Sequence, residues 1–203
     1  MKKVLICISG YPGSGKSIFA DVGVDLGIPV LRMGDVIREV SLKKYGKIDK
    51  DTLAKASIEI RNTLGNNAVA ILLARKIKSM EDKIIIIDGI RSMDEVKELS
   101  KAGETIVISL IASREKRLNR LRLRRREDDT LDPGDFIDRD HREKTFGMDV
   151  VLENTDIFVY NEDITIDELR SIARKIFTDI EKNVYREGNR EEEELDRTSP
   201  EKE

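Results

Sequence analysis

A glycine-rich segment close to the N-terminus constrains the fold of this chain more than any other feature. It directly follows the apolar run Val-Leu-Ile-Cys-Ile over residues 4–8, and its members are Gly10, Tyr11, Pro12, Gly13, Ser14, Gly15, Lys16 and Ser17. This spacing fits GxxxxGK[ST], a motif in which a strand leads through a tight turn into a helix. The sequence therefore predicts a strand, a turn and a helix within its first 26 residues.

The residue types in this segment indicate which ligand it would bind. Without a Cβ, its three glycines let successive backbone N–H groups approach a single phosphate. The N-terminus of the following helix adds positive potential, and Lys16 supplies a cation for the β and γ phosphates. The hydroxyl of Ser17 is a ligand type that Mg²⁺ accepts. The segment predicts a site for a nucleoside triphosphate with Mg²⁺ on Ser17.

Apolar runs and helical patterns alternate along the rest of the chain. Further runs rich in β-branched residues occur at 28–31, 84–87, 106–110 and 157–160, and helical patterns occur at 16–26, 35–44, 51–79, 93–101, 113–126, 135–144 and 166 to about 185. Such continuous apolar strands are typical of parallel sheets that are covered on both faces. The alternation predicts an α/β fold, a three-layer, doubly wound, five-stranded parallel sheet. Its ligands would lie at the carboxyl ends of the strands.

Two excursions from this alternation are expected beside the ligand. Gly65-Asn66-Asn67 should break the 51–79 pattern into two helices, which gives a helical arm over about residues 45–80. Asp132-Pro133-Gly134-Asp135 predicts a turn and a helix start, and so a short lid over about residues 124–142. The predicted domain spans residues 1–183.

Length and charge limit the remaining possibilities. The 203 residues suffice for one sizeable domain, and the net charge is −3. Residues 186–203 hold eight acids and four bases, so 184–203 is predicted to be a disordered acidic tail. The near-neutral body does not favour nucleic acid as a general partner. No apolar stretch reaches membrane-spanning length, which predicts a cytoplasmic protein without a membrane partner. The sequence makes no prediction of oligomeric state.

Two isolated residues of reactive types, a cysteine and a histidine, do not indicate a catalytic or metal site. Cys7 is the only cysteine, so no internal disulfide can form, and its place in an apolar strand predicts a buried, inert thiol. His141 is the only histidine and has no spaced partners for a metal, so it is predicted to lie at the surface.

Two pairs of charged residues lie at predicted strand ends. Asp35 and Arg38 open the helix after the second strand, where Asp35 could cap the helix and Arg38 could point toward the ligand. Asp88 and Arg91 follow the 84–87 run. A carboxylate beside such a loop commonly holds Mg²⁺ through water, and an arginine can form paired hydrogen bonds with a phosphate. Asp88 is therefore predicted to be a metal residue and Arg91 a phosphate residue.

A dense basic run precedes the predicted lid. Arg120 and Arg124 share a helix face at i, i+4 spacing, and such like charges repel unless an anion lies between them. This favours a phosphate clamp, with a nucleic-acid patch as the alternative. Arg139, or Arg142 on the same predicted helix, could close over the same anion.

With these residues in view, the sequence resembles the nucleoside-monophosphate-kinase-like P-loop proteins, the group that includes adenylate kinases and dephospho-CoA kinases. More narrowly, it is similar to archaeal adenylate-kinase-related proteins, over residues 1 to about 182. Gly34-Asp35-x-x-Arg38 resembles the acceptor-phosphate element of adenylate kinases, and Asp88-Gly89-x-Arg91 resembles their Asp-Gly-x-Pro-Arg. Arg120 and Arg124 look like the pair that begins the lid, with Arg139 as its returning arginine.

Three departures from the adenylate kinase pattern concern the acceptor side. Met33 stands where threonine is usual, Asp88-Gly89-Ile90-Arg91 lacks the proline, and the lid segment 127–134 is short and has no zinc cysteines. These departures leave the expected fold and phosphate donor unchanged, but they leave the identity of the acceptor open.

The resemblance implies a Mg²⁺-dependent P-loop kinase that moves the γ-phosphoryl group of ATP to a small phosphorylated acceptor, above all a nucleoside monophosphate. Lys16, Arg120, Arg124 and Arg139 would be its catalytic cations, and Asp35, Arg38 and Arg91 would bind the acceptor. Dephospho-CoA kinase is the first alternative, since Asp35 could serve as the general base for a hydroxyl acceptor. The second is a nucleotide-switched regulatory or RNA-associated ATPase without an acceptor.

Overall fold

The computed structural model describes residues 3–124 and 132–198, and over 187–198 it describes the backbone alone. Its centre is one five-stranded sheet in the order β2-β3-β1-β4-β5, in which every adjacent pair of strands is parallel. The strands are β1 (Val4–Ser9), β2 (Val30–Arg32), β3 (Ile84–Ile90), β4 (Glu104–Ile111) and β5 (Ile157–Tyr160). The predicted five-stranded parallel sheet of the α/β class is confirmed.

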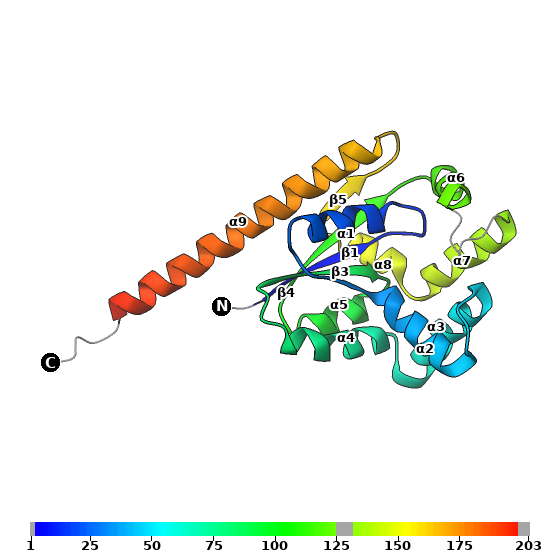
Figure 1. Cartoon of the computed structure of the whole chain (residues 1–203), viewed down its shortest axis with the longest axis horizontal. Helices are drawn as coiled ribbons and strands as arrows, with labels where there is room; N and C mark the ends of the chain where they lie inside the picture. The colour runs from blue at the N-terminus through cyan, green and yellow to red at the C-terminus, as the bar shows by residue number, and fades with distance from the viewer. Residues whose placement is uncertain (1–2, 125–131, 199–203) are drawn as a thin grey trace.

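Helices cover both faces of this sheet (Figure 1). They are α1 (Lys16–Asp25), α2 (Met33–Tyr45), α3 (Lys50–Leu64), α4 (Ala68–Ser79), α5 (Met93–Leu99), α6 (Arg114–Arg124), α7 (Pro133–Thr145), α8 (Met148–Glu153) and α9 (Ile166–Thr198). The break between α3 and α4 falls at Gly65, where φ is +92°, as the sequence predicts. The short α8 was not predicted, because six residues are too few to show a helical period.

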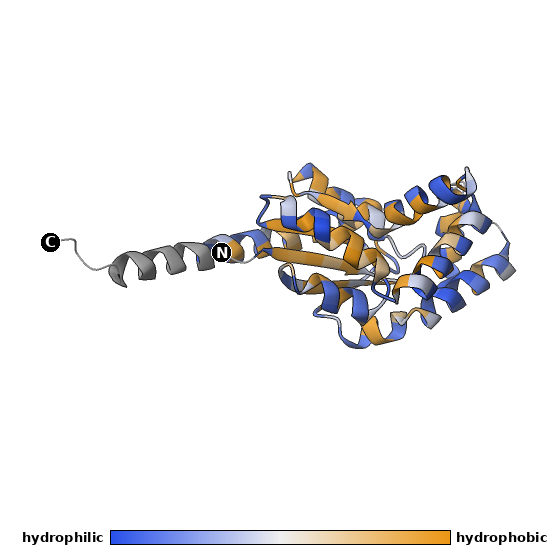
Figure 2. Ribbon diagram, turned by 90° about the horizontal axis from the view of Figure 1, so that it is seen from below, coloured by the Kyte–Doolittle hydropathy of each residue, from blue (hydrophilic) through white to orange (hydrophobic). Residues whose placement is uncertain are grey.

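Alternate residues of the central strand pack into two separate apolar layers. Leu5 and Cys7 lie in the layer beneath the helices that follow β2 and β3, whereas Ile6 and Ile8 lie in the layer beneath α1 and α9. Figure 2 shows strands that are hydrophobic along most of their length and helices with one polar face. Burial on both faces explains why the strand sequences are continuous apolar runs.

The carboxyl ends of β1 and β3 lie next to each other and carry the first candidate residues. Ile8 is in register with Asp88, and the register shifts by one residue beyond this pair, at Ser9 and Ile90. Asp88 was predicted to follow its strand, but it lies within β3, which continues to Ile90. The irregularity at Gly89, where φ is +104°, accounts for this difference, because a bulge re-aims residues without ending the strand.

The C-terminal helix is longer than the sequence predicts. The expected end near Tyr185 and the expected disorder over 184–203 are wrong for the backbone of 186–198, because α9 continues to Thr198. The prediction rested on the lack of apolar residues to bury. A helix that is already formed needs no new nucleus, however, and Glu and Arg have good helix propensity. Figure 1 shows the distal part of α9 projecting away from the sheet, and residues 199–203 lie outside the described residues.

Predictions about the lid and the isolated residues have mixed outcomes. Part of the predicted lid, residues 125–131, lies outside the described ranges. The predicted helix start is present, since the Asp132 side chain accepts hydrogen bonds from two backbone N–H groups of α7.

Cys7 is buried, which raises the pKa of its thiol, and His141 is exposed. In the two described ranges, no helix is long and apolar enough to span a membrane.

Candidate functional site

The turn after β1 has a conformation that only glycine allows at its tightest points. Gly13 has φ +83°, and a Cβ there would come within 2.6 Å of the Arg117 carbonyl oxygen on α6. Gly15 has φ +102°, and its Cβ would lie 2.4 Å from Nδ2 of Asn161, which follows β5. Neighbouring elements therefore pack closely against the turn and fix the conformation of its backbone, as expected for a preformed phosphate-binding loop.

Lys16 lies folded over this turn and is half-buried. Its Nζ donates hydrogen bonds to the carbonyl oxygens of Gly10, at 2.6 Å, and Tyr11, at 3.1 Å. Burial is the main cause that lowers its pKa to about 8, while the carboxylates of Asp88 and Glu143 act in the opposite direction. A phosphate placed beside Lys16 would stabilise the charged form, because an opposite charge at close range offsets desolvation.

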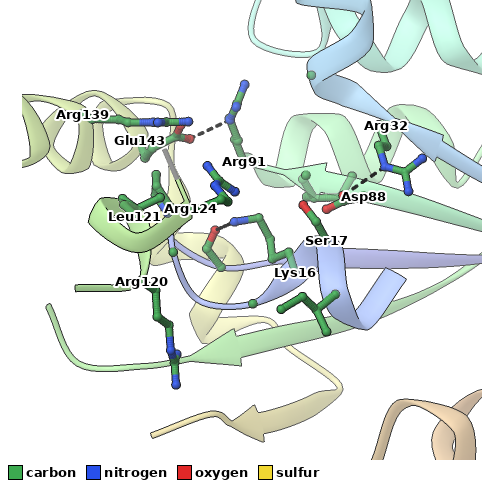
Figure 3. A pocket seen from close by; sticks show the side chains of 18 of the residues that line it. Lys16, Ser17, Arg32, Asp88, Arg91, Arg120, Leu121, Arg124, Arg139 and Glu143 are labelled. Carbon is green, nitrogen blue, oxygen red and sulfur yellow. Dashed lines mark hydrogen bonds and ion pairs between the residues drawn. The ribbon is translucent and has the colours of Figure 1, made fainter. Parts of the chain in front are cut away.

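Ser17 and Asp88 point toward each other at one end of the site (Figure 3). Asp88 is 7% exposed, and burial raises the pKa of its carboxyl group. The nearest charged partner is Arg32, whose Nε lies 3.9 Å from Asp88 Oδ2 and which also pairs with Asp21. A hydroxyl and a carboxylate fit Mg²⁺, which favours oxygen ligands and usually keeps water and phosphate oxygens around it. No group of three or more His, Cys, Asp or Glu residues suited to a metal occurs in the part of the chain that the structure describes.

These residues line a cavity of about 770 Å³. This volume falls within the range of small-molecule sites in proteins. Three acidic side chains line it, Asp21, Asp88 and Glu143, against nine basic ones, which are Lys16, Arg32, Arg38, Lys50, Arg91, Arg120, Arg124, Arg139 and Arg142. This excess of positive charge suits a ligand, or a pair of ligands, with several negative charges.

Arg91 lies on the far side of Lys16 from Ser17, close to the lid helix α7 (Figure 3). Its Nε is 2.7 Å from Oε2 of Glu143, an oxygen without a hydrogen-bond partner, so charge alone holds the pair. Arg91 and Arg139 both lie near enough to Lys16 to lower its pKa. The structure thus brings Lys16, Arg91 and Arg139 together.

The predicted pair Asp35 and Arg38 is only partly directed at the cavity. Arg38 lines it, and its Nη1 lies 3.1 Å from Oδ1 of Asp35. The Asp35 side chain is 57% exposed and does not line the cavity. Asp35 is also not the helix cap, because α2 begins at Met33 with Arg32 as its N-cap. Asp35 therefore pairs with Arg38 and lies outside the cavity lining.

Arg120 and Arg124 do not lie together as the single clamp that their spacing suggests. Figure 3 shows Arg124 on the side of Lys16 and Arg91, whereas Arg120 points the other way. Arg120 Nη2 donates to Oδ1 of Asn161 and to the carbonyl oxygen of Glu162, each at 3.3 Å. Long side chains can diverge from one helix face when acceptors on another element hold one of them.

The sequence analysis missed Arg117, which ties the turn to the lid. Its Nη1 donates to the Pro12 carbonyl at 3.1 Å and to Oδ1 of Asp140 at 2.8 Å. The guanidinium also lies 5.1 Å from the ring centre of Tyr11 and 5.0 Å from that of Phe136. Within a run of eight bases, no pattern marks this arginine as the buried one.

Asn161 and Glu143 were also missed as site residues. Asn161 Nδ2 donates to the carbonyl oxygen of Ser14 at 2.8 Å, which fastens the end of β5 to the turn. Glu143 lies on α7, one turn beyond Arg139. Only the placement of the last strand and the predicted lid helix could have pointed to these positions.

The sequence of the chain is similar to known families. A family model described as an AAA domain matches residues 9–135. A UPF0200 protein from Staphylothermus marinus is 35% identical over 183 residues, which is 90% of this chain and 96% of the relative. A UPF0200 protein from Thermococcus onnurineus is 37% identical over 164 residues, which is 78% of this chain and 89% of the relative.

Solved structures of low sequence identity share the fold. TT1252 from Thermus thermophilus gives a TM-score of 0.63 at 16% identity, and the match covers 88% of this chain and 98% of that one. A shikimate kinase from Acinetobacter baumannii, solved in complex with shikimate, gives 0.57 at 18% identity and covers 88% and 93%. The resemblance to P-loop kinases of small molecules is confirmed at the level of the fold.

Proposed function

The chain belongs to the UPF0200 protein family, and from that premise we propose that it is an ATP- and Mg²⁺-dependent phosphotransferase. It moves the γ-phosphoryl group of ATP to a small phosphorylated acceptor, and a nucleoside monophosphate is the acceptor that fits the site best. The family match and the kinase-like fold support phosphoryl transfer in general. The assignment of ATP as donor and of a small phosphorylated acceptor depends on the residues of the site.

The donor side is supported by the turn over residues 10–17. Its glycine-dependent backbone, the N-terminus of α1 and Lys16 suit the phosphates of a nucleoside triphosphate. Ser17 and Asp88 are the residues that would hold Mg²⁺, which would supply positive charge to offset that of the phosphates. ATP as donor is also what supports a cytoplasmic location.

The observation that carries the acceptor side is the position of Arg91 beside Lys16 in the same cavity. The turn suits the phosphates of the nucleoside triphosphate. The arginines across the cavity from it therefore suit a second anion. Arg91 directly follows β3 and Arg38 lies on α2, and both can donate paired hydrogen bonds to phosphate oxygens. We assign these two arginines to the acceptor phosphate.

The chain's own residues would act mainly by positioning and by charge. Lys16, Arg124 and Arg139 neutralise the oxygens of the phosphoryl group while it lies between donor and acceptor. Closure of the lid and the arm would exclude water, which otherwise competes with the acceptor. An ion pair between Lys50 of α3 and Asp135 of α7, at 2.6 Å, already joins arm to lid.

The two alternative functions receive less support. Dephospho-CoA kinase would need a general base near the acceptor hydroxyl, and Asp35, the candidate for it, does not line the cavity. An RNA-associated ATPase would use the arginines of α6, but Arg117 and Arg120 of that helix are engaged with Asp140 and Asn161.

An ADP-release assay across acceptors tests the proposal. Wild-type protein with Mg²⁺ and ATP is given each nucleoside monophosphate, dephospho-CoA, RNA or no acceptor. Release that depends on a monophosphate supports the proposal. Release that depends on dephospho-CoA, or slow release stimulated only by RNA, would support one of the alternatives instead.

A further inference from the structure

We infer that Phe146 is a ring-stacking residue of the acceptor pocket, and that the acceptor carries a planar ring beside its phosphate. This inference rests on the proposed function and adds a specificity-determining residue to it. The observations that carry it are a partly exposed aromatic ring at the cavity wall, a rigid support behind that ring, and its connection to Arg91.

Phe146 lines the cavity and its ring packs against a buried cation. Phe146 immediately follows α7, is partly exposed and lines the cavity. The guanidinium carbon of Arg61 lies 4.3 Å from the centre of the ring. With Arg61 packed against it, the ring is held in place and can offer its other face to a flat ligand.

Arg61 is itself fixed by a buried acid. Its side chain is 3% exposed, and Nη2 lies 3.0 Å from Oε1 of Glu95, which is fully buried. Nη1 also donates to Oγ of Ser57 at 2.7 Å. Because both charged groups are buried and paired, Arg61 holds the ring of Phe146, here called the ring platform, in one geometry.

The same acid connects the platform to the arginine assigned to the acceptor phosphate. Oε2 of Glu95 accepts a hydrogen bond from the backbone N–H of Arg91 at 2.8 Å. The carboxylate of Glu95 therefore contacts both Arg61, which packs against the Phe146 ring, and the backbone of Arg91. This fixes the ring platform and the phosphate residue relative to each other.

Helices α2 and α3 contribute apolar residues to the cavity wall beside the polar Arg38, Lys50 and Ser57. Ile37 of α2 and Leu53 and Ala54 of α3 line it, in the same helical pair that supplies Arg38 and Arg61. A slot with apolar residues in its wall, an aromatic face and arginines at one end suits a molecule with a flat ring and a phosphate. A sugar phosphate without a planar base would leave this apolar surface in contact with water.

A tryptophan reporter tests the inference, because the chain contains no tryptophan. Phe146→Trp places the sole indole at the platform, and Tyr185→Trp, on α9 away from the cavity lining, is the matched control. Each variant is titrated with nucleoside monophosphates and with ribose 5-phosphate. We expect saturable quenching of Phe146→Trp by at least one monophosphate, none by ribose 5-phosphate, and none in the control.

A second variant gives an independent readout should the tryptophan disturb the fold. Phe146→Leu should raise the KM of the best acceptor at least about fivefold, the effect of losing one base–aromatic stack. The KM for ATP and the melting temperature should stay close to wild type, and Phe146→Tyr should retain the wild-type acceptor KM. A merely structural role would change the melting temperature and both KM values together.

The outcomes separate this inference from the proposed function. Wild-type turnover of a monophosphate that leaves Phe146→Trp fluorescence and the Phe146→Leu acceptor KM unchanged would overturn the stacking role alone. Absence of quenching by every monophosphate in a folded Phe146→Trp protein would also overturn it. Absence of acceptor-dependent ADP release in the wild type would instead overturn the proposed function, whatever the fluorescence shows.

Discussion

The guanidinium of Arg117 on α6 forms a buried ion pair with the carboxylate of Asp140 on α7, with Nη1 2.8 Å from Oδ1. Each side chain is 6% exposed. The same Nη1 donates to the carbonyl oxygen of Pro12 in the turn over residues 10–17. Helix α6 and the lid helix α7 are thus joined to each other and to the turn through one arginine.

Replacing Arg117 should destabilise the protein strongly. Arg117→Leu leaves Asp140 buried without its main partner, and removing one member of such a pair typically costs about 3–5 kcal/mol. Arg114→Ala is the matched control, since Arg114 Nε lies 3.8 Å from the same carboxylate but its side chain is 62% exposed. Denaturant unfolding of both variants checks this prediction. Equal losses for the two would show that burial of the Arg117 pair is not what matters.

Lys16→Ala should abolish turnover and leave the protein folded. Removing a preorganised charge from a transition state costs on the order of a hundredfold or more in rate. The hydrogen bonds that Lys16 makes to Gly10 and Tyr11 are local, so the melting temperature should change little. Rate assays together with circular dichroism test this prediction. An active variant would refute the assignment of the turn as the donor site.

ATP binding should weaken as the pH rises above about 8. Burial lowers the pKa of Lys16 from 10.5 to about 8, so its charged form is lost over a range where free lysine is still protonated. If the charged form binds ATP, affinity should fall by up to about tenfold between roughly pH 7 and pH 9. Calorimetric titration at several pH values measures this. Lys16→Met should bind weakly and with little pH dependence, and the same slope in that variant would assign the titration to another group.

Arg91→Ala and Arg38→Ala should weaken the binding of the acceptor and leave the binding of ATP nearly unchanged. Each removes a two-pronged donor to a phosphate, so kcat/KM for the acceptor should fall by roughly 2–4 kcal/mol while ATP binding changes little. Lysine at either position should rescue only in part, since it cannot form paired hydrogen bonds.

Two controls sharpen the arginine experiment. Arg75→Ala changes an exposed arginine of α4 outside the cavity and should have no effect. Glu143→Gln keeps the shape of the side chain that pairs with Arg91, so it separates loss of the pair from loss of the arginine. Weakened ATP binding with an unchanged acceptor KM would move Arg38 and Arg91 to the donor side.

A chain that ends after Tyr185 should keep its activity and stability. The buried residues described on α9 are Leu169, Ala173, Phe177, Ile180 and Val184, and all of them precede that point. The melting temperature should therefore change by no more than a few degrees. Calorimetry and the ADP-release assay check this. A larger drop would show that the distal part of α9 contributes packing of its own.

The elements of the fold could be predicted from the sequence because their signals are local. The runs at 4–8 and 84–87 mark buried strands, and glycines at 13 and 15 mark the turn. The residues that were missed depend on contacts between distant segments. Arg117 meets Asp140 across 23 positions, and Arg61 meets Glu95 across 34, and nothing in the local pattern distinguishes these arginines from exposed ones.

The candidate site residues divide in the same way. Lys16, Ser17 and Asp88 could be placed from the sequence because a motif or a strand end fixes their position. The divergence of Arg120 from Arg124 could not be foreseen, since Asn161 and the carbonyl of Glu162, which accept from Arg120, lie 41 and 42 positions further along the chain. Helical spacing places two residues on one face but does not fix where long side chains end.

The most direct test of phosphoryl transfer to an acceptor follows the label from [γ-³²P]ATP. Wild-type protein with Mg²⁺ and the acceptor that most stimulates ADP release is stopped within one turnover, and the products are separated. The proposed function predicts that the label appears in the phosphorylated acceptor in step with ADP, with little free phosphate, and that Arg91→Ala slows this transfer. Label found only as inorganic phosphate, at the same rate with and without acceptor, would contradict it and favour an ATPase.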